Sequence, residues 1–266
     1  MSETILLPGD HIGHPQGKKS TAPLKLTPGL RLLQDERANS HKSKPVITTT
    51  QAGLLTTTQK RSGITISVQT FPKRRYVPSP NDLVIAQIRS TTTDYFQCSL
   101  TPNSQPALLG QLAFEGATKK TRPQLRPSEI VYARVLSVGV GEVELTCVNP
   151  ATGKAEPDGL GPLTGGTTFD ISTGFANRLM MGGGPDKSGV VVLEELGKKL
   201  EKQGGFEIAV GKNGKVWVDC SGAGEARVRA TVAIGRCLTE TDEKKLGVSE
   251  QKKLVTRVLK ELNLDS

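Results

Sequence analysis

Four basic side chains stand close together near the middle of this 266-residue chain, in the segment KKTRPQLR. They are Lys119, Lys120, Arg122 and Arg126. Residues 79–153 as a whole carry six basic and six acidic residues, so the cluster is a local excess on a balanced segment. Phosphate groups respond to cations within a Debye length of about 8–10 Å, which makes a local cluster more informative than diffuse charge. The segment therefore predicts a phosphate-binding loop, with an ordinary solvated loop as the alternative.

A second candidate is the segment Gly211-Lys212-Asn213-Gly214, which has the G-x-x-G form of the loop that holds a nucleic-acid backbone in KH domains. In the usual KH arrangement that loop joins two helices. Here EIAV precedes the segment and KVWV follows it, and Asn-Gly between two strands is the strongest short signal for a hairpin. We therefore predict a structural turn, with an RNA clamp as the alternative. Trp217, the single tryptophan, lies on the second strand, where packing is its expected use.

Histidine, cysteine and carboxylate residues argue against a catalytic or metal site. The three histidines all lie in the first 41 residues, so Ser–His or Cys–His chemistry would have to be built there: His11, His14 and His41. The four cysteines form no CxxC pair, and we expect buried free thiols: Cys98, Cys147, Cys220 and Cys237. The acids of residues 79–153 are scattered and lack the converging set that a two-metal nuclease needs. We predict no catalytic residue, no metal and no cofactor.

Five strand candidates, separated by turns, surround the basic cluster. They are Leu83–Arg89, Tyr95–Leu100, Ala107–Leu112, Ile130–Val138 and Val143–Val148. Five short strands at this spacing are typical of the small Greek-key barrel of the OB type. The basic cluster falls in the long connection before the fourth strand. Since such loops rim the oligonucleotide-binding face of OB barrels, we expect an RNA strand to pass this loop.

The segments before and after the expected barrel differ from it in composition and in the secondary structure that they predict. Residues 1–78 carry 12 Lys or Arg and 4 Asp or Glu, and they predict a β-rich domain of short strands such as Ile5–Leu7 and Ile64–Val68. The polar segment Arg31–Pro45 is expected to be a mobile loop. Two prolines in Val77–Asp82 mark a boundary, after which the OB-type domain is expected over residues 79–153.

The final part, residues 154–266, is expected to form a small KH-type α/β domain after a Gly/Pro-rich linker at Ala155–Gly166. The elements expected there are helices over Gly174–Met181 and Val190–Lys202, strands over Phe206–Val210 and Lys215–Val218, a helix over Glu225–Leu238, and a last helix with Ser249 as its N-cap. The spacing of Val228 and Val232 predicts that they lie on the packing face of their helix. The fold class is thus multidomain, β followed by α/β.

The sequence gives no sign of a membrane segment. No stretch approaches 18 consecutive apolar residues. The first ten residues lack the basic flank and the apolar run of a secretory signal. We therefore expect no membrane partner.

Several strings of this sequence are similar to those of the cap subunits of the eukaryotic RNA exosome, which combine an N-terminal domain, an S1 domain (an OB barrel) and a KH domain. The strings are LLPGD (6–10), RRYVPSPNDLVIAQI (74–88), KKTRPQLRPSEIVYARV (119–135), GFANRLM (174–180) and VGKNGKVWV (210–218). Among the cap subunits, the chain most resembles the ribosomal RNA-processing protein forty type. The missing CxxC pairs disfavour the zinc-ribbon type, and the other S1/KH type is the closer rival.

The resemblance implies a subunit without catalytic activity in a hetero-oligomer. Such subunits sit on a ring of RNase PH-like proteins beside other cap subunits, and their S1 domains surround the entrance through which single-stranded RNA threads toward a separate 3′-to-5′ exonuclease. By position, Lys119, Lys120 and Arg122 fall where the family presents basic residues to RNA, and the Gly-x-Asn-Gly loop is structural. The resemblance also implies ribosomal RNA processing and a place in nucleus, nucleolus and cytoplasm. A free-standing S1/KH RNA-binding regulator is the alternative.

Overall fold

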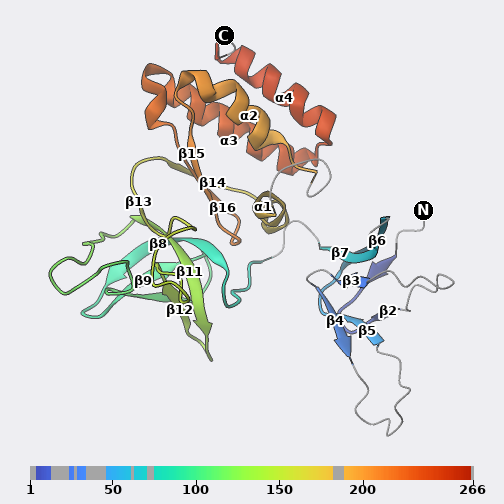
Figure 1. Ribbon diagram of the computed structural model, residues 1–266, viewed down its shortest axis with the longest axis horizontal. Helices are drawn as coiled ribbons and strands as arrows, with labels where there is room; N and C mark the ends of the chain where they lie inside the picture. Colours follow the sequence, from blue (N-terminus) through green and yellow to red (C-terminus); the bar gives the residue numbers. More distant parts are fainter. Residues whose placement is uncertain are drawn as a thin grey trace, which may run out of the picture. The chain divides into compact units, whose positions relative to one another are not determined.

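The computed structural model describes residues 4–12, 24–26, 29–33, 46–60, 63–70, 75–181 and 189–264 (Figure 1). Contacts divide the chain into two compact units, residues 1–74 and 75–266. The second unit contains two hydrophobic cores, one inside a barrel and one beneath a group of helices. The predicted order of a β-rich part, a five-stranded barrel and an α/β part is confirmed, whereas the domain limits at residues 78 and 153 stay predictions.

The N-terminal unit contains two small sheets. One has the order β1-β6-β7-β3, and the other has the order β2-β5-β4. The strands are β1 (Ile5–Leu6), β2 (His11–Ile12), β3 (Leu24–Leu26), β4 (Leu30–Leu33), β5 (Val46–Thr49), β6 (Gly53–Lys60) and β7 (Gly63–Thr70). Alternating apolar residues bury Leu6, Ile66 and Val68. The start of the predicted loop Arg31–Pro45 is strand β4, and its residues 34–45 lie outside the described residues.

The barrel begins the second unit, and all five predicted strands are confirmed. They are β8 (Leu83–Thr91), β9 (Tyr95–Ser99), β10 (Ala107–Gly110), β11 (Ile130–Val138) and β12 (Val143–Thr146). The order β12-β10-β9-β8-β11, with β12 also paired to β11, closes the barrel. Strand β13 (Gly161–Leu163) pairs with the outer side of β11. It lies in the segment that was predicted to be a linker, because three residues rich in Gly and Pro give no period-two signal.

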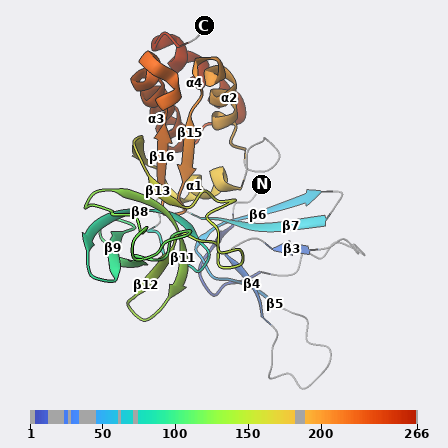
Figure 2. The same cartoon turned by 60° about the vertical axis from the view of Figure 1, so that its left-hand side comes forward.

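The α/β region packs helices on a three-stranded sheet of order β14-β16-β15. Its elements are β14 (Thr167–Asp170), α1 (Thr173–Met180), α2 (Val192–Leu200), η1 (Glu201–Gln203), β15 (Glu207–Val210), β16 (Lys215–Asp219), η2 (Ser221–Ala226), α3 (Arg227–Lys244) and α4 (Val248–Glu261). In both views the β15–β16 hairpin extends from the helices toward the barrel (Figure 1 and Figure 2). The predicted helices and both predicted strands are present, but β14 was not predicted.

Two details of this region correct the sequence predictions. The N-cap of helix α4 is Gly247 rather than Ser249, because the Glu250 carboxylate accepts a hydrogen bond from the Gly247 N–H at 2.9 Å and fixes the first turn earlier. Val228 and Val232 of α3 are exposed, at 71% and 44%. The buried face of α3 instead contains Ala230, Ala233, Ile234, Gly235, Cys237, Leu238 and Thr241. Small residues are needed where the sheet comes close, because a Cβ at Gly235 would lie 2.3 Å from the Phe169 ring.

All four cysteines are free and buried, as predicted. Burial raises the pKa of the Cys98 and Cys237 thiols to about 12. None of the helices among the described residues has the length and apolar character needed to cross a membrane.

Candidate nucleic-acid interface

The basic cluster lies in the connection between β10 and β11, here called the basic loop (residues 111–129). Phe114 and Leu125 tie this loop to the barrel, since both side chains are buried in its core. The Phe114 ring meets the Phe96 ring edge-on, with centroids 6.3 Å apart. Two apolar anchors thus hold the ends of a polar segment.

A compact turn fixes the part of the loop between these anchors. The Thr118 and Thr121 hydroxyls lie 2.8 Å apart, and the Thr121 hydroxyl also donates to the Gly116 carbonyl at 3.2 Å. The Arg122 N–H donates to the Thr118 carbonyl at 2.9 Å. The threonine hydroxyls and the backbone groups of the turn therefore bond to one another and fix the turn without the Lys119 side chain, which is exposed.

The four cations of the basic loop differ from Arg134 and Lys212, the barrel-side cations that form ion pairs. Lys119, Lys120 and Arg126 are exposed and Arg122 is half-buried. Within the part of the chain that the structure describes, no carboxylate lies within ion-pair distance of any of the four, whereas Arg134 on the barrel wall pairs with Asp158 at 2.5 Å. The basic loop therefore keeps its charge available for an anion.

The Gly211–Gly214 segment is the turn of the β15–β16 hairpin, and Asn213 inserts into the barrel. Its side chain is 7% exposed. Asn213 Oδ1 accepts from the Ile85 N–H at 3.2 Å, and Nδ2 donates to the Ile85 and Leu100 carbonyls at 2.8 Å. A Cβ at Gly211 would lie 2.7 Å from the Ile85 nitrogen, so the barrel strand passes directly against this backbone. Gly214 has φ +81°, which favours glycine.

Lys212 of the same turn also faces the barrel. Its ammonium lies 2.6 Å from Asp82 Oδ1, and its N–H donates to the Leu83 carbonyl at 2.8 Å. Asp82 Oδ2 accepts from the Tyr76 hydroxyl at 3.0 Å, and burial with the nearby Asp82 charge raises the pKa of Tyr76. The cation and N–H that a G-x-x-G loop would offer to phosphate are thus used within the protein.

Asp82 and Tyr76 were not singled out from the sequence. The local signal in the sequence is the turn-forming string SPND, residues 79–82. In the structure Asn81 of this turn has φ +70°. Their role becomes visible only when the hairpin and the barrel are seen together.

Trp217 packs at the junction of barrel and α/β region. It is 5% exposed, it belongs to the barrel core, and its Nε1–H donates to the Gly165 carbonyl at 3.0 Å. A Cβ at Gly166 would lie 2.5 Å from that nitrogen, so glycine is required for the close approach. The packing use predicted for Trp217 agrees with this burial.

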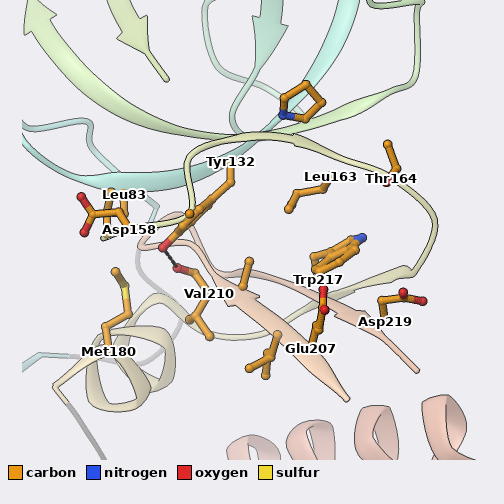
Figure 3. Close-up of a pocket in the computed structure, with 14 residues that line it drawn as sticks. Leu83, Tyr132, Asp158, Leu163, Thr164, Met180, Glu207, Val210, Trp217 and Asp219 are labelled. Carbon is orange, nitrogen blue, oxygen red and sulfur yellow. Dashed lines mark hydrogen bonds between the residues drawn. The ribbon is translucent and has the colours of Figure 1, made fainter. Parts of the chain in front are cut away.

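A cleft of about 590 Å³ opens at the same junction, and its lining is acidic (Figure 3). Glu207 and Asp219 line it near the Trp217 ring, and Asp158 lines it on the side of Leu83. The Tyr132 hydroxyl donates to the Val210 carbonyl at 3.1 Å across it, and burial raises the pKa of Tyr132 to about 12. Arg134 pairs with Asp158 and Arg227 pairs with Asp219 at 3.6 Å, and the lining residues include no Lys or Arg, so the cleft offers no cation to an RNA backbone.

The described residues contain no group of three His, Cys, Asp or Glu side chains that could hold a metal ion. His11 is engaged by the Thr48 hydroxyl at 3.1 Å, and His14 and His41 lie outside the described residues.

Comparison with known proteins follows the same division of the chain. The family profile for the S1 domain of exosome complex component RRP40 matches residues 76–161, and a KH-domain profile matches residues 166–223. The exosome complex component RRP40 of Saccharomyces cerevisiae is 33% identical over 82% of this chain and 82% of its own length. The chain belongs to the RRP40 family.

Other relatives extend the match. The RRP40 of Drosophila melanogaster is 32% identical over 91% of this chain and 90% of its own length. A crystal structure named for an exosome complex RNA-binding protein superposes with a TM-score of 0.54 at 19% identity, covering 73% of this chain and 100% of that chain. This last likeness concerns the fold alone. The resemblance to S1/KH exosome cap subunits is thus confirmed.

Proposed function

We propose that this RRP40-family chain is a non-catalytic RNA-binding cap subunit of the RNA exosome. In this role it guides single-stranded RNA into the central channel, where a separate catalytic subunit degrades or processes RNA from the 3′ end, including ribosomal RNA precursors. Its partners are RNase PH-like ring subunits and the other cap subunits. It acts in the nucleus and nucleolus, and also in the cytoplasm. The family membership supports this assignment.

The observation that carries the RNA-guiding part is the exposed charge of the basic loop. Lys119, Lys120 and Arg122 are held on an anchored turn without a carboxylate partner among the described residues. Such cations attract phosphates of any sequence, because charge carries no base information. A guide that must let RNA move benefits from this, since each contact is weak and exchangeable.

The test is the salt dependence of RNA binding by the exosome reconstituted with the Lys119→Ala, Lys120→Ala, Arg122→Ala chain. Each phosphate contact on a single strand contributes about −0.7 to the slope of log K against log salt, so removing three should flatten the slope by up to about 2 units. Filter binding or fluorescence anisotropy across a salt series measures it.

The matched control removes three exposed lysines of the α/β region, Lys202, Lys253 and Lys260, and therefore the same net charge. It should leave the slope unchanged. Equal slopes for wild type and the basic-loop variant would contradict the guiding role. Tight, sequence-selective binding by the chain alone, without association with ring proteins, would favour a free-standing regulator instead.

A further inference from the structure

The turn that joins β11 to β12 presents apolar side chains to solvent. Leu136, Val138 and Val140 are 48%, 44% and 108% exposed. Gly, Pro, Asn, Asp and Ser dominate turns because each has a structural use there, whereas a fully exposed valine contributes nothing to the fold. Single exposed apolar residues are common, but three of them within five residues form a patch, which is typical of an interaction site. We call residues 136–144 the hairpin tip.

A β-bulge places Leu136 outside the barrel core. Val135 pairs with Leu145 and Ser137 pairs with Glu144, so Leu136 is an extra residue of β11 without a partner on β12. Val135 and Leu145 are buried in the core, whereas about half of the Leu136 surface is exposed. Since a bulge re-aims a side chain, this one gives an apolar side chain to the surface.

Hydrogen bonds of the hairpin tip fix its backbone. The Gly139 N–H donates to the Glu142 carbonyl at 2.8 Å and closes the turn, in which Gly141 has φ +85°. The Ser137 hydroxyl donates to Glu144 Oε2 at 2.7 Å and joins the two strands. A tip that is already ordered loses little conformational entropy when it enters a pocket, which favours binding.

The hairpin tip is acidic, although the whole chain has a net charge of +9. Glu142 and Glu144 are exposed, and residues 135–153 contain no Lys or Arg. Carboxylates beside apolar side chains repel the phosphates of RNA and attract Lys or Arg. The charge of the tip is therefore complementary to a protein surface on which basic residues border an apolar pocket.

The hairpin tip and the basic loop lie at opposite ends of β11. The basic loop ends immediately before Ile130, the first residue of this nine-residue strand, and the tip contains its last residue, Val138. At about 3.3 Å per residue such a strand spans roughly 25–30 Å. In both views the tip points away from the helices of the α/β region (Figure 1 and Figure 2). A protein bound at the tip would therefore leave the basic loop open to RNA.

We propose that the hairpin tip is a protein-docking site, at which Leu136 and Val140 enter an apolar pocket of another exosome subunit and Glu142 meets Lys or Arg at the border of that pocket. The inference rests on the proposed function, which places this chain in a hetero-oligomer, and it assigns one surface to that assembly. The apolar side chains supply affinity, and the carboxylate supplies orientation and a faster association.

The test measures association of the labelled full chain with the exosome assembled without it, by fluorescence anisotropy. The double variant Leu136→Ser, Val140→Ser should associate about tenfold or more weakly, because two apolar anchors are lost. Glu142→Lys should also weaken association, and this loss should shrink as salt rises, because salt screens the repulsion between like charges. The matched control, Val228→Ser with Val232→Ser, removes two exposed apolar side chains from α3 and should associate as wild type does.

A photoreactive benzophenone side chain in place of Val140 identifies the contact in the reconstituted exosome. We expect a crosslink to one subunit, in a peptide that contains both apolar and basic residues. Val140→Ser alone, at a fully exposed position, serves if the double variant unfolds at lower urea than wild type.

Wild-type association of the Val140→Ser and double variants would overturn the docking site. So would a crosslink from position 140 to RNA, or weaker RNA binding with unchanged association, since either result would show that the tip contacts nucleic acid. If the wild-type chain joins the assembly and the tip variants join equally well, the docking site alone fails. If the wild-type chain does not join the assembly, the proposed function fails as well.

Discussion

Replacement of Asn213 by alanine is expected to lower the free energy of unfolding of the unit formed by residues 75–266 by about 3–5 kcal/mol. In the antiparallel ladder between β8 and β11, every second residue of β8 uses its backbone N–H and carbonyl to bond to β11. The Val135 N–H donates to the Asp82 carbonyl, so the residues of β8 that bond to β11 are the even-numbered ones. The N–H and carbonyl of Ile85 therefore face Asn213 instead. Alanine would leave these two groups and the Leu100 carbonyl buried without a partner.

The measurement is urea unfolding of the full chain, followed by the fluorescence of Trp217, the single tryptophan, which lies in this unit. Asn103→Ala is the control, because Asn103 is exposed in a turn of the same barrel and should change stability by no more than about 0.5 kcal/mol. A change for Asn213→Ala as small as that of the control would mean that the hairpin is not held to the barrel by this side chain.

Replacement of Gly211 by alanine is expected to cost about 2–3 kcal/mol. The new Cβ would lie 2.3 Å from Asn213 Oδ1, 2.7 Å from the Ile85 nitrogen and 3.3 Å from the Val84 carbonyl carbon. Two of these atoms are backbone of a central barrel strand and cannot rotate away. The hairpin must therefore retreat, which also weakens the hydrogen bonds of Asn213.

Gly197→Ala provides a control of opposite sign in the same urea-unfolding experiment. A Cβ at this position in α2 meets nothing within 4 Å, so alanine should stabilise the helix by up to about 1 kcal/mol. If Gly211→Ala also stabilises the protein, or leaves it unchanged, the barrel and hairpin do not pack as closely as described.

The barrel and its basic loop could be predicted from the sequence because both depend on local patterns. Strands such as β8 and β11 are short, largely apolar runs, and the turns between the barrel strands are marked by Gly and short polar runs. The charge of the basic loop is visible in the sequence itself. Its exposure follows from the loop's length and polarity.

The junction could not be predicted, because its contacts join residues far apart in the chain. Asn213 bonds to Ile85 across 128 positions, and the acceptors there are backbone groups that leave no trace in residue type. The ion pair between Lys212 and Asp82 also joins residues that are far apart in the sequence, at a separation of 130 positions. Strand β14 escaped prediction since TTFD has little apolar pattern, and its place is set by pairing with β16.

The most direct test of the RNA-guiding role is photocrosslinking of RNA held in the assembled exosome that contains this chain. RNA carrying thiolated uridine is irradiated, and the crosslinked peptides are identified by mass spectrometry. We predict crosslinks on the chain at the basic loop, and none at the Gly211–Gly214 turn or in the acidic cleft. Crosslinks confined to that turn or cleft, or RNA cleavage by the isolated chain, would contradict the account.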